Sequence, residues 1–286
     1  MDDNDWLAQR FDAERRHLRA VAYRMLGSLA DADDAVQETW LRLARTNADD
    51  LQNFRGWLTT VLAHICLDML RARRVRREEP MDVHVPDPIV SLDATDPEAE
   101  ALLGDAIGLA MLVVLDTLSP SERLAFVLHD VFAVPFEQIG AILDRSPAAA
   151  KQLASRARRQ VRDAPVPDTD LPRQQQLVDA FLSAARRGDL EGLLAVLDPD
   201  VVLRADAGAG PLGPSRHLKG ARDVAAQAMQ YVRLARYARP ALVNGAPGFL
   251  VAPGGSVVAV IAVTTRSGRI TEIDILADPE RLRAVT

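Results

Sequence analysis

The sequence predicts a multi-domain protein in which two all-α domains are followed by one α+β domain. Residues 5–77 contain no proline and repeat apolar residues at steps of three and four, which is typical of packed helices. Proline-rich stretches at 78–95 and 164–172 interrupt the helical patterns and indicate linkers. Residues 173–286 end in β-branched runs separated by glycine turns, which indicates a sheet. A chain of 286 residues is long enough for this arrangement.

The composition, 48% hydrophobic and 26% charged, is ordinary for a globular protein. No apolar run approaches the roughly 20 residues that span a bilayer, and the N-terminal "MDDNDWLAQRF" is acidic where a secretory signal carries positive charge. We therefore expect a cytoplasmic protein without a membrane partner. The single cysteine, Cys66, excludes an internal disulfide and lies in an apolar context, so we predict a buried thiol. We predict no metal and no cofactor.

The charge is unevenly distributed along this acidic chain, whose formal net charge is −6. The stretch "RSPAAAKQLASRARRQVR" at 145–162 holds six basic residues and no carboxylate, and "RARRVRR" at 71–77 holds five arginines. By contrast, "DADDAVQE" at 31–38 holds four carboxylates. Two basic segments of this kind are typical of a protein that binds a polyanion.

The first helical domain divides at Gly27 and Ser28. The next helix begins in "LADADDAVQETWLRLA", where carboxylates in the first turn interact favourably with the helix dipole. The composition changes at Glu78, because "EEPMDVHVPDPIVSLDATDP" has four prolines in twenty residues and no sustained period. This segment is predicted to be an extended linker.

The second helical domain, 96–163, opens with Asp96 as N-cap and Pro97 as the first helical residue. A clearer start follows, because Ser119 and Glu122 with Pro120 between them form a capping box. The short helix "FEQIGAILD" then leads through a tight turn into a last helix, which Ser146 caps and Pro147 begins. The apolar side of this helix repeats at steps of three and four while its basic residues fall on other faces. The pattern predicts a helix-turn-helix with a basic second helix.

The third domain begins with the helices "QQQLVDAFLSAARRG" and "LEGLLAVL", followed by a strand "VVLRA" and a helix near 218–235. Strand-like runs separated by "NGAPG", "PGG" and "SG" complete it. We predict a curved antiparallel meander with helices on one face. The polar residues nearest a pocket in such a cone are Arg204, Asp206 and His217, and since no motif fixes their role we predict no catalytic residue.

Taken together, "DADDAVQETWLRLA", "NFRGWLTTVLAHICLDMLRARRVRR" and "LSPSERLAFVLHDVFAVPFEQIGAILDRSPAAAKQLASRARRQV" resemble an extracytoplasmic-function (ECF) sigma factor of bacteria. Residues 5–77 correspond to region 2 and 96–163 to region 4, and 173–286 resemble a SnoaL-like domain of the cone-shaped NTF2-like superfamily. The resemblance implies a non-enzymatic subunit that directs RNA polymerase core to promoters. Its partners would be promoter DNA and the β′ clamp helices and β subunit of the polymerase.

The resemblance also assigns roles in region 2. The β′ clamp helices would be contacted by the acidic helix through Asp31, Asp33, Asp34, Gln37, Glu38 and Trp40. His64 stands where many relatives carry an asparagine that contacts a flipped base of the −10 element. The displaced strand would be held by Arg71, Arg73, Arg74, Arg76 and Arg77. The alternatives are a solvated acidic face, a core histidine and an ordinary basic helix end.

In region 4, the helix from Ser146 to Arg162 would enter the major groove at the −35 element. Arginine, lysine and glutamine read base edges there. The candidates near the bases are Lys151, Gln152, Ser155 and Arg156, and those near the phosphates are Arg145, Arg158 and Arg159.

Relatives with a fused domain carry a glycine-rich segment after an aspartate, and this chain matches it in part through Asp206, Gly208 and Gly210. The chain has "DPERL" and "VPDPIV" where those relatives have their tail and linker motifs. We hypothesise that the last domain packs against the linker at 78–107 and regulates the protein in cis, which would replace a separate anti-sigma factor.

Two other classes of protein stay open at this point. One is a one-component transcription regulator whose cone senses a small molecule, and the other is a SnoaL-type cyclase or isomerase with helical appendages. The "DADDAVQETW" segment distinguishes the first of them, because a regulator that does not bind β′ has no need of it. The two arginine clusters argue against the enzyme.

Overall fold

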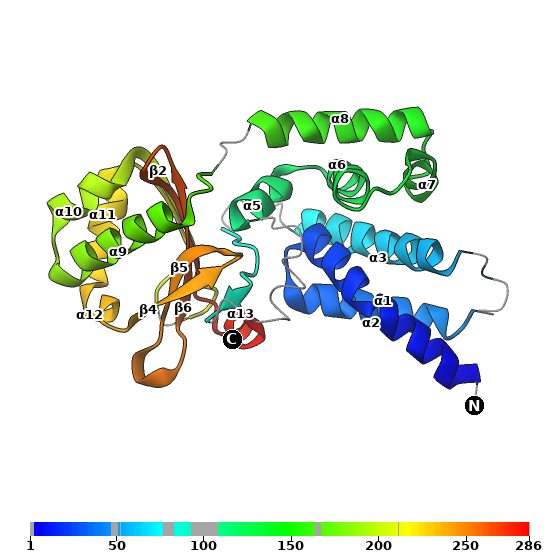
Figure 1. Ribbon diagram of the computed structural model, residues 1–286, viewed down its shortest axis with the longest axis horizontal. Coiled ribbons are helices and arrows are strands. Elements are labelled where there is room, and N and C mark those ends of the chain that lie inside the picture. Colours follow the sequence, from blue (N-terminus) through cyan, green and yellow to red (C-terminus); the bar gives the residue numbers. More distant parts are fainter. Residues whose placement is uncertain are drawn as a thin grey trace. The chain divides into compact units, whose positions relative to one another are not determined.

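The computed structural model describes residues 3–46, 51, 53–76, 83–92, 108–163, 167–210 and 212–285 (Figure 1). They form two compact units. The first unit comprises Met1–Pro80 and Val114–Ala164, and the second comprises Met81–Val113 and Pro165–Thr286. The segment that joins the two helical domains in sequence therefore groups with the C-terminal domain. None of the helices in the described ranges is long and apolar enough to cross a membrane.

Three helices form the first part of unit 1: α1 (Asp3–Leu26), α2 (Leu29–Leu43) and α3 (Phe54–Arg76). The predicted break is confirmed, because Gly27 has φ of +67° and the Ser28 hydroxyl accepts a hydrogen bond from the Asp31 amide (3.2 Å). Large apolar side chains such as Phe11 and Leu62 are completely buried between the helices. Cys66 is buried as predicted, and burial raises the pKa of its thiol to about 12.

The second part of the helical chain contains α5 (Leu109–Thr117), α6 (Pro120–Phe126), the π-helical turn η2 (Val127–Val131), α7 (Phe136–Ile142) and α8 (Pro147–Asp163). The capping box of Ser119 and Glu122 is present. The tight turn before α8 is confirmed by Asp144, whose φ is +52°. Gly140 allows the turn to approach α7, because a Cβ atom there would lie 2.7 Å from the carbonyl oxygen of Arg145. The predicted helix start at Asp96 and Pro97 lies outside the described residues.

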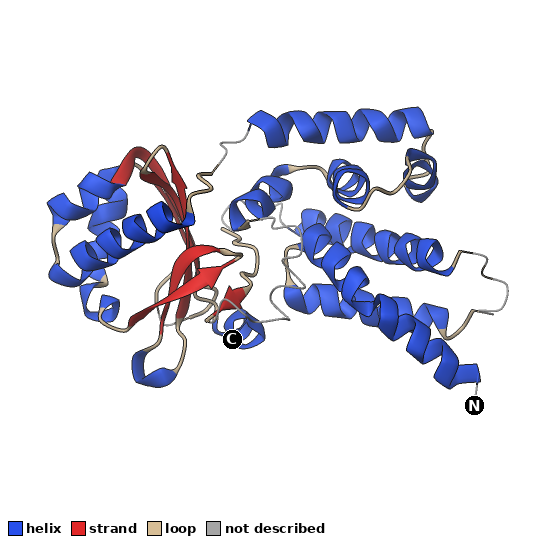
Figure 2. Ribbon diagram, viewed as in Figure 1, coloured by secondary structure: helices blue, strands red, loops and turns tan. Residues whose placement is uncertain are grey.

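The C-terminal domain begins with two helices, α9 (Leu171–Arg187) and α10 (Leu190–Val196). Its remaining elements are β2 (Leu197–Asp206), β3 (Arg216–Lys219), α11 (Ala221–Gln230), α12 (Val232–Ala235), β4 (Ala238–Val243), β5 (Ala246–Val251), the short 3-10 turn η3 (Pro253–Gly255), β6 (Ala259–Arg266), β7 (Arg269–Leu276) and α13 (Pro279–Val285). Helices α9 to α12 lie on one face of the sheet (Figures 1 and 2). The predicted fold class, two helical regions followed by an α+β cone, is confirmed.

The sheet has the strand order β1-β4-β5-β6-β7-β2-β3. Strands β4 to β7 form the predicted antiparallel meander. The parallel pairing of β2 with β7 was not predicted from the sequence, and neither were the strand β3 and the helix α13. Parallel strands need a long connection, and here β3, α11, α12 and the strands β4 to β6 lie between β2 and β7 in the chain.

The first strand of this sheet comes from the linker. Residues 83–92 are extended, as predicted, and β1 (Val90–Ser91) pairs with β4 in an antiparallel register that sets Val90 opposite Val243. The linker is therefore an edge strand of the C-terminal domain.

Candidate nucleic-acid interface

Helix α8 has an exposed surface on which the charged side chains, up to Arg162, are all basic. Ala150, Leu153, Ala154 and Ala157 are buried against α6 and α7, and this packing turns the polar residues outward. The side chains of Lys151, Gln152, Ser155, Arg159 and Arg145 are exposed, and none of them makes a hydrogen bond or ion pair with the described residues. At the N-terminus of the helix, the Ser146 hydroxyl accepts a hydrogen bond from the Ala149 amide (3.2 Å). The helix thus leaves its donors available to an external acceptor.

Two of the predicted α8 contacts are already engaged inside unit 1. Arg158 is half-buried and its Nε donates to Asp130 (2.6 Å). Arg156 is exposed and lies 3.9 Å from Glu122, a distance at which the ion pair is weak. Arg156 can therefore turn to DNA at little cost, whereas Arg158 would have to exchange a close carboxylate for a phosphate.

The arginines at the C-terminal end of α3 differ in exposure and in their partners. Arg71 and Arg74 are exposed, with Arg71 3.6 Å from Asp68. Arg73 is mostly buried, pairs with Asp31 of α2 and donates to the Leu26 carbonyl oxygen (2.6 Å). Its guanidinium therefore joins α3 to α2 instead of pointing to a nucleic acid.

The remaining candidates on α3 are His64, Arg76 and Arg77. His64 is exposed, and its Nδ1 lies 2.9 Å from the Thr60 carbonyl oxygen, so the Nε2 edge faces outward. This position does not fit the alternative of a core histidine. Arg76 is the last residue of α3, and Arg77 lies outside the described residues.

Helix α2 exposes an acidic face. Asp34 and Gln37 are exposed, and their side chains make no hydrogen bond or ion pair with the described part of the chain. Asp33 and Glu38 are paired with Arg19 (2.6 Å) and Arg42 (3.0 Å) respectively, both at partly exposed positions. Of the other two candidates, Asp31 is engaged by Arg73, and the Trp40 ring packs at 5.1 Å from that of Phe11.

Sequence reasoning missed one residue on this face. Leu41 is 41% exposed and lies two turns after Asp34, so it adds an apolar side chain to the acidic surface. Interfaces combine such an apolar contact with a polar rim. An apolar residue on the charged side of the predicted helix was the signal available in the sequence.

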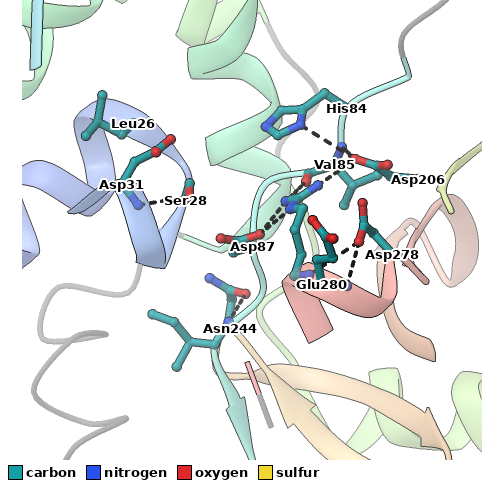
Figure 3. A network of polar contacts seen from close by, with 12 residues as sticks. Leu26, Ser28, Asp31, His84, Val85, Asp87, Asp206, Asn244, Asp278 and Glu280 are labelled. Carbon is teal, nitrogen blue, oxygen red and sulfur yellow. Dashed lines mark hydrogen bonds and ion pairs between the residues drawn. The ribbon is translucent and has the colours of Figure 1, made fainter. Parts of the chain in front are cut away.

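In unit 2, a polar cluster fastens the linker to the C-terminal domain (Figure 3). The guanidinium of Arg281 in α13 donates to Asp87 (2.7 Å), to the Val85 carbonyl oxygen (2.5 Å) and to Asp206 at the end of β2 (2.5 Å). Asp206 also accepts a hydrogen bond from the Val85 amide (3.2 Å) and lies 3.5 Å from His84. We call these five residues the linker clasp.

The electrostatics of the linker clasp favour the ionised carboxylate. Burial opposes ionisation of Asp206, but the hydrogen bond from His84 and the charge of Arg281 outweigh it and lower its pKa. Asp87 is almost completely buried and is paired with the same guanidinium. Removing Arg281 would take one positive charge away from two mostly buried carboxylates.

A second polar contact holds the linker at Ile89, two residues after Asp87. Asn244, in the turn after β4, accepts a hydrogen bond from the Ile89 amide (3.1 Å) through its side chain and donates one from its own amide to the Ile89 carbonyl oxygen (2.8 Å). The predicted packing of the last domain on the linker is confirmed for residues 83–92.

The glycine-rich segment after Asp206 allows this arrangement. Gly208 has φ of +50°, and a Cβ atom there would collide with the carboxylate of Asp278. Asp278 caps α13 by accepting from the Glu280 amide (2.8 Å), which in turn sets the position of Arg281. The signal for the missed helix was present in the sequence, because an aspartate followed by Pro279 is a helix start.

Both helical domains match models of known protein families. Residues 10–76 match the family model for Sigma-70 region 2, and residues 109–161 match the model for Sigma-70, region 4. The chain is 34% identical over 290 residues to the probable ECF RNA polymerase sigma factor SigI of Mycobacterium tuberculosis, which covers 99% of this chain and 97% of that protein. It is 38% identical over 289 residues to the ECF RNA polymerase sigma factor SigJ of the same organism, covering 95% and 91% respectively.

This chain belongs to the ECF RNA polymerase sigma factor family. The crystal structure of Mycobacterium tuberculosis SigJ superposes on the sigma factor with a TM-score of 0.76 at 35% identity, covering 97% of this chain and 98% of that one. The similarity thus includes the C-terminal domain. Sigma factors are transcription initiation factors and not enzymes, so the predicted family and the predicted absence of catalysis are confirmed and the cyclase alternative is not supported.

In unit 1 of this sigma factor, regions 2 and 4 contact each other directly. Arg123 of α6 is 2% exposed, pairs with Asp116 and donates to the Arg24 carbonyl oxygen of α1 (3.2 Å). The Gln138 amide of α7 donates to the Gly56 carbonyl oxygen (3.0 Å) and to the Thr60 hydroxyl (2.9 Å), one turn before His64. We call Arg123 and Gln138 the joint between regions 2 and 4. Neither residue was identified from the sequence, because the pattern of one region does not show which of its polar side chains contact the other region.

The three residues suggested for a cone pocket lie together on one face of the sheet. Arg204 pairs with Glu272 and Asp274 (Nε to Oδ1 2.6 Å), Asp206 belongs to the linker clasp, and His217 is exposed. The cavity of the cone lies on the opposite face and is lined by their strand neighbours Leu203, Ala205 and Arg216. The suggestion that Arg204, Asp206 and His217 lie nearest the pocket is therefore wrong, because their side chains are on the face of the sheet away from the cavity.

Proposed function

We propose that this sigma factor directs RNA polymerase core to promoters in the cytoplasm, with α3 at the −10 element and α8 at the −35 element. The observation that carries the proposal is the outward face of α8, where Lys151, Gln152, Ser155 and Arg159 are exposed and no described residue satisfies their side chains. Lysine, glutamine and arginine donate to base edges and phosphates in the major groove. The acidic face of α2, including Asp34 and Gln37, would bind the β′ clamp helices.

The first experiment is transcription in vitro with bacterial core polymerase and fragmented genomic DNA, followed by mapping of RNA 5′ ends. The sigma factor should produce new start sites that share elements near −35 and −10. Arg159→Gln should weaken promoter binding by the holoenzyme and reduce the slope of log K against log salt by about one. Arg162→Gln removes another exposed positive charge, one that lies at the end of α8 and 3.9 Å from Asp163, and it is the matched control because it should leave the slope nearly unchanged. The absence of new starts, together with binding of the free protein to DNA, would favour an operator-binding regulator.

Regions 2 and 4 must separate for this function. Elements about 25 base pairs apart lie roughly 85 Å apart along straight duplex at about 3.4 Å per base pair. Unit 1 contains about 130 residues, and a compact body of that size has a radius of gyration of about 14 Å. The joint formed by Arg123 and Gln138 would therefore open when the sigma factor binds polymerase.

We further propose that the C-terminal domain regulates this opening in cis by holding the linker between regions 2 and 4. The linker clasp and the β1–β4 pairing support this proposal, because both attach residues within 83–92 to the C-terminal domain. A separate anti-sigma factor would then be unnecessary for inhibition.

The test uses Arg281→Met with Arg283→Met as control, because both arginines lie in α13 and, of the two, Arg281 contacts the described part of the linker. Transcription should rise several-fold with Arg281→Met and stay unchanged with the control. Equal transcription from both variants would contradict regulation through the clasp. Ending the chain at Leu171 is a less specific test, because it removes the partner strand β4, the residues Asp206 and Arg281, and Asn244 at once.

A further inference from the structure

The C-terminal domain contains a partly open cavity of about 140 Å³ between the sheet and helices α9, α11 and α12. Its walls are almost entirely apolar, and they include Phe181, Leu203, Phe249, Ile261 and Ile273. Well-packed interiors contain few voids larger than a water molecule. An apolar cavity of about 150 Å³ is large enough for a benzene ring. The cone therefore has room for a small molecule where a structural core would be filled.

One positively charged group faces this cavity. Arg216 of β3 lines the cavity, and its Nη1 donates to Oε1 of Gln227 (2.9 Å), which is 9% exposed. No carboxylate is among the described residues of the lining. Tyr231 also lines the cavity, but its hydroxyl donates a hydrogen bond to the Leu212 carbonyl oxygen (2.7 Å). The Gln227 contact fixes one edge of the guanidinium and leaves its other N–H groups as donors.

Two other arginines of this domain that are mostly buried have acidic partners, whereas Arg186 and Arg269 donate to backbone carbonyl oxygens. Arg204 is paired with Asp274 and Glu272 on the outer face of the sheet, and Arg281 is paired with Asp87 and Asp206. Among the described residues, the side-chain partner of Arg216 is the neutral amide of Gln227. A guanidinium next to an apolar wall is costly unless an anion or water satisfies it.

We propose that this cavity binds a small, mostly apolar molecule that carries one anionic group, of the size of a monocyclic aromatic carboxylate. Arg216 holds the carboxylate by charge-assisted hydrogen bonds, and the apolar walls contact the ring. Gln227 positions the guanidinium. The proposal concerns ligand binding alone and does not depend on the promoter function or on regulation by the linker.

The test uses the full-length sigma factor and ¹⁹F NMR with three probes of one shape: 4-fluorobenzoate, fluorobenzene and 4-fluorobenzylamine, which is a cation at neutral pH. Saturable binding of 4-fluorobenzoate should be at least tenfold tighter than that of fluorobenzene, and the cation should bind most weakly. Equal affinity for all three probes would refute the anionic specificity, and no saturable binding of any of them would refute the site.

Variants locate the binding. Arg216→Gln should lower the affinity for 4-fluorobenzoate about tenfold and leave fluorobenzene binding unchanged. Lys219→Gln removes a positive charge from the same strand but at an exposed position outside the cavity, and it should change neither. A similar loss with Lys219→Gln would mean that the anion binds the surface.

A cavity-filling variant completes the design. Ala228→Leu, on the α11 wall, should reduce the binding of both 4-fluorobenzoate and fluorobenzene. Thermal unfolding of each variant identifies any that no longer folds, and Ala235→Leu on the α12 wall is the alternative in that case. Retention of full binding when the cavity is filled would overturn the proposal.

Discussion

At the scale of single residues, the arginines of this sigma factor occupy three environments. Arg123 is buried with Asp116 in the joint between regions 2 and 4. Arg73 links two helices of region 2 through Asp31. Arg159 is exposed on α8 without a partner among the described residues. The same side chain thus contributes to stability in two of these positions and is available for binding in the third.

Arg123→Met should lower the free energy of unfolding of unit 1 by about 3 kcal/mol, because it leaves the partly buried carboxylate of Asp116 without its counter-ion. Urea denaturation followed by helical circular dichroism measures the change. Arg159→Met, an exposed position, should change it by no more than about 0.5 kcal/mol. A loss below about 1 kcal/mol for Arg123→Met would show that the pair is not essential to the joint.

His17 should make unit 1 less stable at mildly acidic pH. Burial, and secondly the charge of Arg55, lower its pKa below 6.5, while Glu14 acts in the opposite direction. Its ring packs edge-on against Phe132 at 5.3 Å. The unfolded chain then binds more protons than the folded one, so stability falls as pH decreases through 6.5 and levels off below the folded pKa.

Unfolding free energies measured between pH 7.5 and 5.5 check this effect of His17. The slope of stability against pH should be smaller in His17→Gln than in the unchanged protein. His64→Gln is the control, since His64 is exposed on α3. Identical slopes for the two variants would contradict the assignment.

At the scale of secondary-structure elements, the sequence predicts what is local and misses what depends on partners. The caps at Ser119 and Ser146 are interactions within four residues, and both are present. β1 has only two residues, and its partner β4 lies far along the chain. No local pattern could reveal this pairing. The same holds for the inward direction of Arg216, which is decided by the helices that cover the sheet.

Asn244→Gly should loosen β1 without disturbing the turn that it occupies. Asn244 has φ of +51°, which glycine tolerates, so the main loss is the side-chain hydrogen bond to the Ile89 amide. A hydrogen bond of about 1 kcal/mol corresponds to roughly fivefold faster amide exchange in residues 83–92. Hydrogen exchange with mass spectrometry measures it.

The control for this change is Ser267→Gly, in a turn of equal geometry between β6 and β7, with φ of +52°. It should leave exchange in residues 83–92 unchanged. If both variants or neither accelerate exchange there, the side chain of Asn244 does not hold the linker.

At the scale of the whole molecule, the order of the segments along the chain differs from the way in which they group into compact units. The linker follows region 2 and precedes region 4, yet it belongs to the same compact unit as the domain that ends the chain. The resemblance to ECF sigma factors predicted both regions and their order. It left open how firmly the last domain holds the linker, because "VPDPIV" and "DPERL" match the family motifs only in part.

A chain that ends at Asp163 should be cleaved by proteinase K within residues 83–92 much faster than the full-length protein. In the full chain these residues are paired with β4 and held by Arg281, and in the shortened chain they lack both partners. Limited proteolysis with mass spectrometry locates the cuts. Comparable protection in both chains would mean that the helical regions alone protect the linker.

The strand pairing of the linker also has a consequence for synthesis. Val243 leaves the ribosome about 150 residues after its partner Val90, which at 5–20 residues per second is a delay of roughly 8–30 s. Within that interval both promoter-reading regions are already translated, while the segment between them has no strand to join. The linker is therefore restrained late in synthesis, and a nascent chain released early would carry both promoter-reading regions with only their mutual contacts, and no C-terminal domain, to restrain them.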